Sequence, residues 1–261
     1  HYGTRRQRQM CIRDREQIMP LKADRAMYLL APIIALVPSF LIFMIIPLGP
    51  DLNIEIGGKD YIVDFVGADL NVGVLYFLAL SSIAVYSVVL AGWSSGSKYP
   101  LLGGVRASAQ MISYEAAMGL SLVPVILYSG SLSLVDIVSS QSGNLSTTIP
   151  ILSSIVSFIP KWNIFPQFIA FGIFFIAAVA EVNRAPFDLV EAEQELVGGF
   201  HTEYSGFRFA MFFLAEYINM FNMCAITATF FLGGWLGPTF EGFLPPVLSA
   251  IMPIIWLGVK T

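Results

Sequence analysis

Residues 26–48 read AMYLLAPIIALVPSFLIFMIIPL, which is 23 consecutive residues without a charged side chain. A transmembrane α-helix needs about 20 mostly apolar residues to cross the hydrocarbon core of a bilayer. Pro32 and Pro38 are tolerated in such a helix, because neighbouring helices can satisfy the carbonyl groups that proline leaves unpaired. The stretch therefore predicts a membrane-spanning helix, and the rest of the chain is interpreted from it.

Further apolar windows of similar length follow, separated by short polar loops, and no internal repeat relates them. The apolar stretch 150–160 is too short to span a bilayer and is interpreted as a re-entrant or interfacial piece. The predicted fold class is all-α, a polytopic membrane helix bundle with about six transmembrane helices. The five further predicted spans are 70–92, 107–129, 165–182, 207–233 and 243–259.

The composition supports a membrane protein and excludes several other classes. Hydrophobic residues make up 56% of the 261 residues and charged residues 12%, whereas soluble domains carry about 25% charged residues. Two cysteines and two histidines are too few for an iron–sulfur cluster or a bis-histidine haem, and no CxxC or HExxH spacing occurs. We therefore expect no metal site and no redox centre in this chain. The net charge of −4 argues against nucleic-acid binding.

The basic residues of the loops set the predicted orientation, because cytoplasmic loops retain Lys and Arg. Beyond the first fifteen residues, only Lys59 and Lys161 fall on the predicted outer side. The predicted cytoplasmic side carries the other basic residues, which are Lys22, Arg25, Lys98, Arg106, Arg184, Arg208 and Lys260.

The first fifteen residues, HYGTRRQRQMCIRDR, differ from the rest of the chain. They contain five of its fourteen basic residues, and no apolar segment typical of a targeting signal follows closely. We interpret residues 1–15 as a foreign or mistranslated segment. Residues 16–261 are predicted to form a single integral membrane domain with a cytoplasmic acidic loop at 181–207.

The segment 181–216 concentrates acidic side chains between two predicted spans. It holds seven of the chain's eighteen acids, although topology does not select for acidity in a cytoplasmic loop. On a helical turn Arg184 could pair with both Glu181 and Asp188. Burial and mutual repulsion both raise carboxylate pKa values, so clustered acids can exchange protons near neutral pH. A purely structural ion-pair network is the alternative interpretation.

Glu115 and Glu216 are the acids that lie deepest in predicted spans. Glu115 is eight residues past Ala107, or roughly 12 Å along a helix that rises 1.5 Å per residue. An ionisable group at that depth is costly and usually faces a bundle interior or a water cavity. Both residues are predicted to handle protons, with a structural hydrogen bond between helices as the alternative.

Two motifs carry a resemblance to a known family. They are GWSSGSKYPLLGGVRASAQMISYEAAMGLSL (92–122) and AEVNRAPFDLVEAEQELVGGFHTEYSGFRFAMFFLAEY (180–217). The sequence closely resembles the H-type (mitochondrial subunit 1) membrane subunit of respiratory complex I, NADH:quinone oxidoreductase, over nearly the whole chain from about Glu16. Members of this family have eight spanning helices, so the resemblance implies a fragment that lacks the first and the last of them.

The resemblance implies two groups of site residues. The proton path would consist of buried carboxylates, namely Glu115, Glu181, Glu191, Glu193, Glu195, Glu203 and Glu216. The quinone cavity would be lined or shaped by eight residues, namely Asp24, Arg25, Arg184, Phe187, Asp188, Tyr204, Phe207 and Arg208.

The resemblance also implies a mechanism and partners. Flavin and iron–sulfur clusters would be held by partner subunits, this subunit would bind no cofactor, and quinone would be the substrate. The partners would be the peripheral quinone-site subunits, the antiporter-like membrane subunits and the lipid bilayer. Quinone reduction would shift the protonation of the loop acids and drive proton translocation. The bacterial plasma membrane is the expected location, in preference to the mitochondrial inner membrane.

Three alternatives remain open from the sequence. One is a homologous membrane anchor of a hydrogenase or a coenzyme F420-type dehydrogenase, which would keep the loop motif and use other electron partners. Another is a secondary transporter, although such folds often show internal repeats. The third is a structural scaffold whose acids only pair with basic residues.

Overall fold

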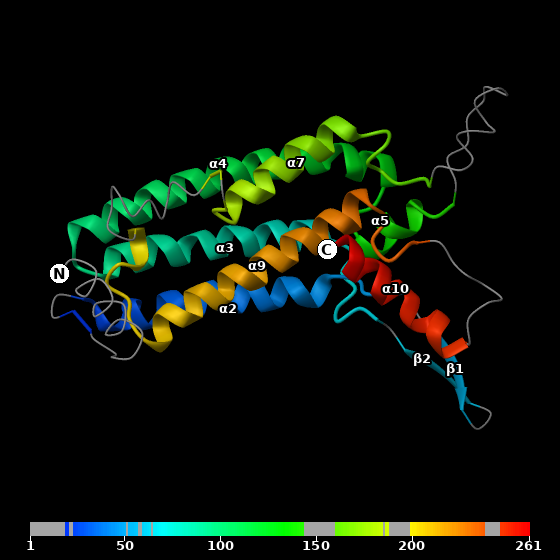
Figure 1. Cartoon of the computed structure of the whole chain (residues 1–261), viewed down its shortest axis with the longest axis horizontal. Coiled ribbons are helices and arrows are strands. Elements are labelled where there is room, and N and C mark those ends of the chain that lie inside the picture. The colour runs from blue at the N-terminus through cyan, green and yellow to red at the C-terminus, as the bar shows by residue number, and fades with distance from the viewer. Residues whose placement is uncertain are drawn as a thin grey trace, which may run out of the picture. The chain divides into compact units, whose positions relative to one another are not determined.

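The computed structural model describes residues 19–20, 23–50, 52–56, 59–63, 65–143, 160–184, 186–187, 199–237 and 246–261. Helices dominate these residues, and one antiparallel hairpin accompanies them (Figure 1). The elements are α2 (Arg25–Ile45), β1 (Leu52–Ile56), β2 (Lys59–Val63), α3 (Gly73–Ser94), α4 (Lys98–Ser129), α5 (Leu134–Ser140), α7 (Phe168–Glu181), η1 (Gly199–His201), α9 (Phe207–Phe231) and α10 (Pro246–Lys260).

The structure confirms the predicted class, an all-α membrane helix bundle. Within the described part of the chain, α2, α3, α4 and α9 are long and apolar enough to cross a bilayer. The window 165–182 corresponds to α7, an apolar helix of 14 residues. The predicted piece at 150–160 lies almost entirely outside the described residues, as does the whole segment 1–15, so both remain predictions.

The hairpin β1–β2 is an element that was not predicted from the sequence. Its register pairs Leu52 with Val63 and Ile56 with Lys59. Alternating apolar residues on either side of Gly57-Gly58 are the hairpin signal that could have found it.

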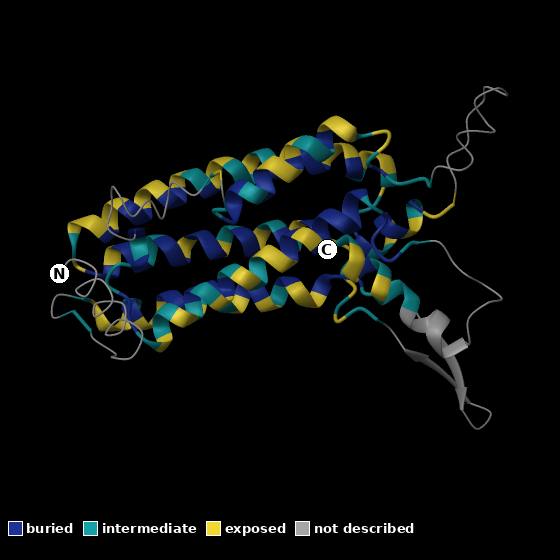
Figure 2. Cartoon of the chain, in the orientation of Figure 1, coloured by how far each residue is buried: buried dark blue, intermediate teal, exposed yellow. Residues whose placement is uncertain are grey.

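The chain forms two compact units, and the long helices contribute to both. Unit 1 comprises residues 1–41, 78–118 and 176–220. Unit 2 comprises residues 42–77, 119–175 and 221–261. Buried and exposed residues alternate along the helices (Figure 2), as expected of helices that pack on one face only.

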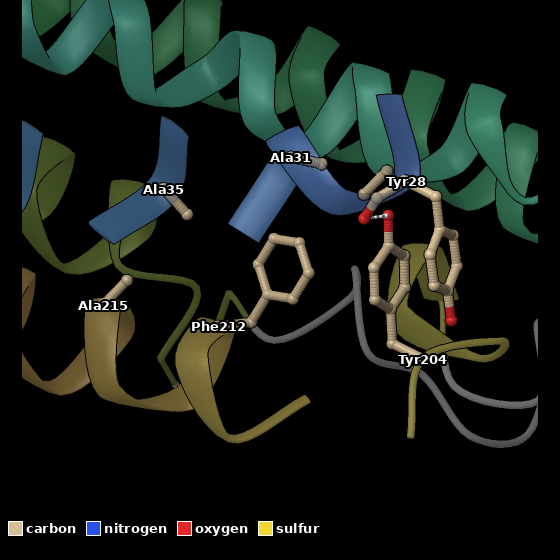
Figure 3. Close-up of a cluster of buried hydrophobic side chains, with 7 residues drawn as sticks. Tyr28, Ala31, Ala35, Tyr204, Phe212 and Ala215 are labelled. Carbon is tan, nitrogen blue, oxygen red and sulfur yellow. Dashed lines mark hydrogen bonds between the residues drawn. The ribbon is translucent and has the colours of Figure 1, made fainter. Parts of the chain in front are cut away.

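The core of unit 1 joins α2 to α9 and to the loop before α9. Tyr28, Ala31 and Ala35 share one face of α2, because residues three and four apart in a helix lie on the same side. Tyr204 and Phe212 pack against this face (Figure 3). The alanines leave room for the aromatic rings, so aromatic side chains fill the space between the two helices.

Glycines allow α3 and α4 to approach closely in unit 1. A Cβ atom on Gly92 would lie 2.6 Å from the carbonyl oxygen of Pro100 and 3.2 Å from the Cα of Gly104. Small residues at such crossings are typical of membrane helices. Helix α4 begins at Lys98, nine residues before the predicted span 107–129, so most of the stretch between the predicted spans is helical.

Buried amides fix the loop before α7 in unit 2. The side chain of Asn163 donates to the carbonyl of Phe230 (2.9 Å), and its backbone N–H donates to Gln141 (3.2 Å). Gln141 in turn donates to the carbonyl of Thr229 (3.0 Å). These bonds satisfy carbonyls at the end of α9, which water cannot reach inside a bilayer.

The predicted span 243–259 forms α10, a helix of 15 residues that packs on loops. Pro253 lies against Gly49, which follows α2, and the ring of Trp256 lies against Gly237, which follows α9. Lys260 was predicted on the same side as Arg208, but its amine lies against carbonyls that follow the opposite end of α9. The prediction for Lys260 is therefore wrong.

The amine of Lys260 caps the end of α9. It donates to the carbonyls of Leu232 (2.7 Å), Gly234 (3.0 Å) and Leu236, and it lies 4.4 Å from the ring centre of Trp162. A cation at a helix C-terminus also complements the helix dipole.

Replacing Lys260 by Met removes the hydrogen bonds that its amine donates to the carbonyls of Leu232, Gly234 and Leu236. We expect the amides of residues 232–237 to exchange hydrogen about tenfold faster, as the loss of ~1.4 kcal/mol implies. Hydrogen exchange followed by mass spectrometry measures this. Unchanged exchange in Lys260→Met, with Lys161→Met as control, would show that the amine does not hold the loop.

Candidate functional site

Glu181 is an acid buried at the end of α7 in unit 1. Its side chain is 7% exposed, and the hydroxyl of Ser81 on α3 donates to its Oε1 atom at 2.6 Å. Its second oxygen, Oε2, is buried and has no hydrogen-bond partner among the described residues. A buried carboxylate with one free oxygen has room to take up a proton there.

Glu115 lies near the middle of α4 and is half-buried. The hydroxyl of Ser82 on α3 donates to its Oε1 atom at 2.5 Å. Because α4 begins at Lys98, Glu115 lies deeper in its helix than predicted from the sequence. The structure thus brings these two predicted acids together around α3.

Glu216 of α9 pairs with Arg184, which follows α7. A guanidinium nitrogen of Arg184 lies 3.3 Å from Oε1 of Glu216, and the guanidinium lies 5.1 Å from the ring centre of Tyr217. The predicted helical turn through Arg184 does not form, because α7 ends at Glu181 and Asn183 adopts a φ of 53°. The reversal of the chain directs Arg184 to α9.

A clasp of two tyrosines connects α2 to the loop that precedes α9. The rings of Tyr28 and Tyr204 stack with centres 4.1 Å apart. The hydroxyl of Tyr28 donates to the carbonyl of Glu203 (2.8 Å), and that of Tyr204 donates to the carbonyl of Tyr28 (3.2 Å; Figure 3). Arg208 lies 5.3 Å from the ring centre of Tyr28. The clasp therefore holds three of the predicted site residues, Glu203, Tyr204 and Arg208, beside α2.

Burial determines the chemistry of Tyr204. Its side chain is fully buried, and this burial raises the pKa of its hydroxyl to about 12. The hydroxyl therefore stays protonated and able to donate at physiological pH. Because the ring stacks on Tyr28, the predicted contact of Tyr204 with a quinone ring would require the stack to open.

Phe187 is held against α4. The side-chain amide of Gln110 donates to its carbonyl (3.1 Å), and the ring of Tyr114 meets its ring edge-on, with centres 5.6 Å apart. Gln110 and Tyr114 share one face of α4 and make the contacts to Phe187, and Glu115 is the next residue of the same helix. The start of the acidic loop lies next to the helix that bears this acid.

The remaining predicted quinone contacts lie near helix ends. Asp24 is exposed and caps α2, since its carboxylate accepts from the backbone N–H of Ala26 (3.0 Å). Arg25 and Phe207 are exposed at the first residues of α2 and α9. Four predicted residues, Asp188, Glu191, Glu193 and Glu195, lie outside the described residues and stay predictions.

Sequence reasoning missed three side chains that complete the site. Ser81 binds Glu181, Ser82 binds Glu115, and Tyr28 holds the carbonyl of Glu203. The sequence signal for these serines is that they are two adjacent hydroxyl side chains in a mostly apolar helix.

The fold and the buried acids define a multi-pass membrane protein that keeps carboxylates inside its helices. The chain belongs to the NADH dehydrogenase family, whose profile matches residues 11–261. This match confirms the resemblance described above.

Three curated relatives with similar sequences carry the name of the H-type component of NADH-quinone oxidoreductase. One of two such proteins from Geobacter metallireducens is 49% identical over 256 residues, which cover 93% of this chain and 69% of the relative. A relative from Koribacter versatilis is 48% identical over 254 residues, which cover 94% and 68% respectively. A relative from Brevibacillus brevis is 45% identical over 246 residues, which cover 94% and 62%.

Proposed function

We propose that this chain is the H-type membrane subunit of a proton-translocating NADH:quinone oxidoreductase and that its buried glutamates couple quinone reduction to proton translocation. The names of its relatives support the assignment to such a complex. The single observation that supports the coupling role is that Glu115 and Glu181 each bind a hydroxyl of α3, supplied by the consecutive residues Ser82 and Ser81.

The proposed proton path runs through acids of unit 1. Glu203 lies at the clasp before α9, Glu216 pairs with Arg184, and Glu181 and Glu115 flank α3. Ionisable groups in membrane helices commonly form proton relays. The acids outside the described residues, Glu191, Glu193 and Glu195, complete the proposed path.

The proposed quinone cavity borders the same loop. Apolar and aromatic walls with a few polar groups are typical of sites for such ligands. Phe187 and Phe207 supply rings, whereas Tyr204 acts by holding the loop in place. Polar contacts would come from Asp24, Arg25, Arg184, Asp188 and Arg208.

The redox chemistry would be supplied by partners. Electrons would arrive from NADH through flavin and iron–sulfur clusters on peripheral subunits, and antiporter-like subunits would receive the charge change in the membrane. Charges in a low-dielectric interior interact strongly, so protonation of one acid alters the next. A bacterial plasma membrane is the proposed location.

The test replaces Glu181 or Glu115 by Gln in the assembled complex. Glutamine keeps the shape and can still accept from the serine, but it cannot release a proton. We expect fewer protons translocated per electron pair in proteoliposomes, at normal complex assembly. The control is Asp136→Asn, which removes an exposed acid on α5. Normal pumping in both glutamine variants would contradict the proposed coupling role.

A further inference from the structure

Glu115 of α4 and Glu181 of α7 each accept a hydrogen bond from a serine of α3. The proposed proton path does not explain these two serines. Ser81 and Ser82 are consecutive in α3. Consecutive residues of a helix point about 100° apart. One helix therefore presents two hydroxyls to two different helices, Ser81 to α7 and Ser82 to α4.

We propose that Ser81 and Ser82 are positioning residues for proton transfer, with Ser82 adapting to both charge states of Glu115 and Ser81 fixing the orientation of Glu181. This inference rests on the proposed function, because it assigns partners to acids of that path.

Ser82 has one proton and two acceptors within reach. Its hydroxyl lies 2.5 Å from Oε1 of Glu115 and 3.1 Å from the carbonyl oxygen of Leu78, one turn earlier in α3. When Glu115 is ionised, Ser82 donates to the carboxylate. When Glu115 is protonated, its hydroxyl donates to the oxygen of Ser82, whose own proton turns to the carbonyl of Leu78.

This exchange keeps every group hydrogen-bonded in both states. A serine hydroxyl donates once and accepts through its lone pairs, and the change needs only rotation about its C–O bond. A buried polar group left without a partner costs free energy that a paired one does not. Ser82 therefore provides a hydrogen-bond partner for Glu115 in both of its charge states, between which a proton carrier must alternate.

Ser81 constrains Glu181 in a different way. It is buried, and it donates to Oε1 of Glu181. The other oxygen, Oε2, has no hydrogen-bond partner among the described residues. Because Oε1 accepts from Ser81 whether or not the acid is charged, Oε2 is the atom that takes up and releases the proton.

The test compares two variants of equal shape, Ser82→Thr and Ser82→Val. Threonine keeps the hydroxyl and valine replaces it by a methyl group, so any effect of the added volume is the same in both. We expect the rate of proton pumping to be about fivefold lower in Ser82→Val than in Ser82→Thr, the rate ratio that ~1 kcal/mol represents. Equal pumping in the two variants would overturn the role of Ser82.

Redox-induced infrared difference spectra of the assembled complex give a second readout. Loss of a donor raises the stretching frequency of a carboxylic C=O group, so the carboxyl band of Glu181 moves to higher wavenumber in Ser81→Ala. Ser87→Ala is the matched control, because Ser87 is a buried serine of the same helix that donates to its own backbone at Ala84 (2.6 Å). An unmoved band in Ser81→Ala would overturn the role of Ser81.

The two proposals fail in different ways. If Glu115→Gln and Glu181→Gln lose pumping while the serine variants pump normally with unmoved bands, the serines are not positioning residues and the proposed function stands. If the glutamine variants pump normally, the proposed function fails and this inference fails with it.

Discussion

Replacing Tyr204 by Ala is expected to destabilise unit 1 by about 3–5 kcal/mol, the usual cost of removing a fully buried aromatic ring. The ring stacks on Tyr28 and meets Phe212 edge-on, with centres 4.1 and 5.0 Å away. Its removal leaves a cavity between α2 and α9 and frees the loop before α9 from α2. Limited proteolysis within residues 199–206 and the Tm of the purified complex measure both effects.

Tyr204→Phe separates the ring from the hydroxyl. It keeps the stack and loses the bond to the carbonyl of Tyr28, so we expect a loss of only about 1 kcal/mol. If the Ala and Phe variants lose the same stability, the hydroxyl and not the ring holds the loop. If neither variant changes proteolysis, the clasp does not hold the loop.

Replacing Gly103 by Val is expected to cost about 2–3 kcal/mol through overpacking. A Cβ atom on Gly103 would lie 2.8 Å from the carbonyl carbon of Gly199 and 3.0 Å from the backbone nitrogen of Phe200. Backbone atoms cannot turn aside as a flexible side chain can, so α4 and η1 must separate. The loop before α9 would then shift, and quinone reduction by the complex is expected to decline.

The matched control for this prediction is Gly172→Ala. Gly172 lies inside α7, and among the described residues a Cβ there would meet no atom within 4 Å apart from the neighbouring turns of its own helix. Alanine favours a helix over glycine by up to about 1 kcal/mol, so this variant should keep or raise the Tm while Gly103→Ala lowers it. The same sign of change in both alanine variants would show that the contact with Gly199 is not tight.

The spans could be predicted from the sequence because their signal is local. Residues 26–48 are apolar over a length that only a bilayer requires, and α2 occupies Arg25–Ile45. The start of α4 could not be predicted, because Gly103 and Gly104 weaken a helix on their own. The two glycines allow close contacts with other segments: Gly103 lies against Gly199, and Gly104 lies against Gly92. The sequence alone does not show these contacts.

The acids of the candidate site could be predicted from the sequence, whereas the residues that bind them could not. Glu115 and Glu181 are conspicuous because charges are rare in apolar helices. Serine is common in such helices, so the sequence does not single out Ser81 and Ser82. Their role is visible only in the structure, where they bind Glu181 of α7 and Glu115 of α4. Arg184 was assigned to its neighbours in sequence, whereas the positive φ of Asn183 directs it to Glu216.

The tyrosine clasp sets an order for the biosynthesis of this protein. Its two partners are 176 positions apart in the chain, and a nascent polypeptide emerges from its N-terminus onward. The helices α2, α3 and α4 are therefore already in the translocon or the lipid while Tyr28 still lacks its partner. The loop that carries Glu203 can take its final position only after the ribosome has delivered Tyr204, so the last step of maturation at this site joins a segment made before α3 and α4 to one made after them.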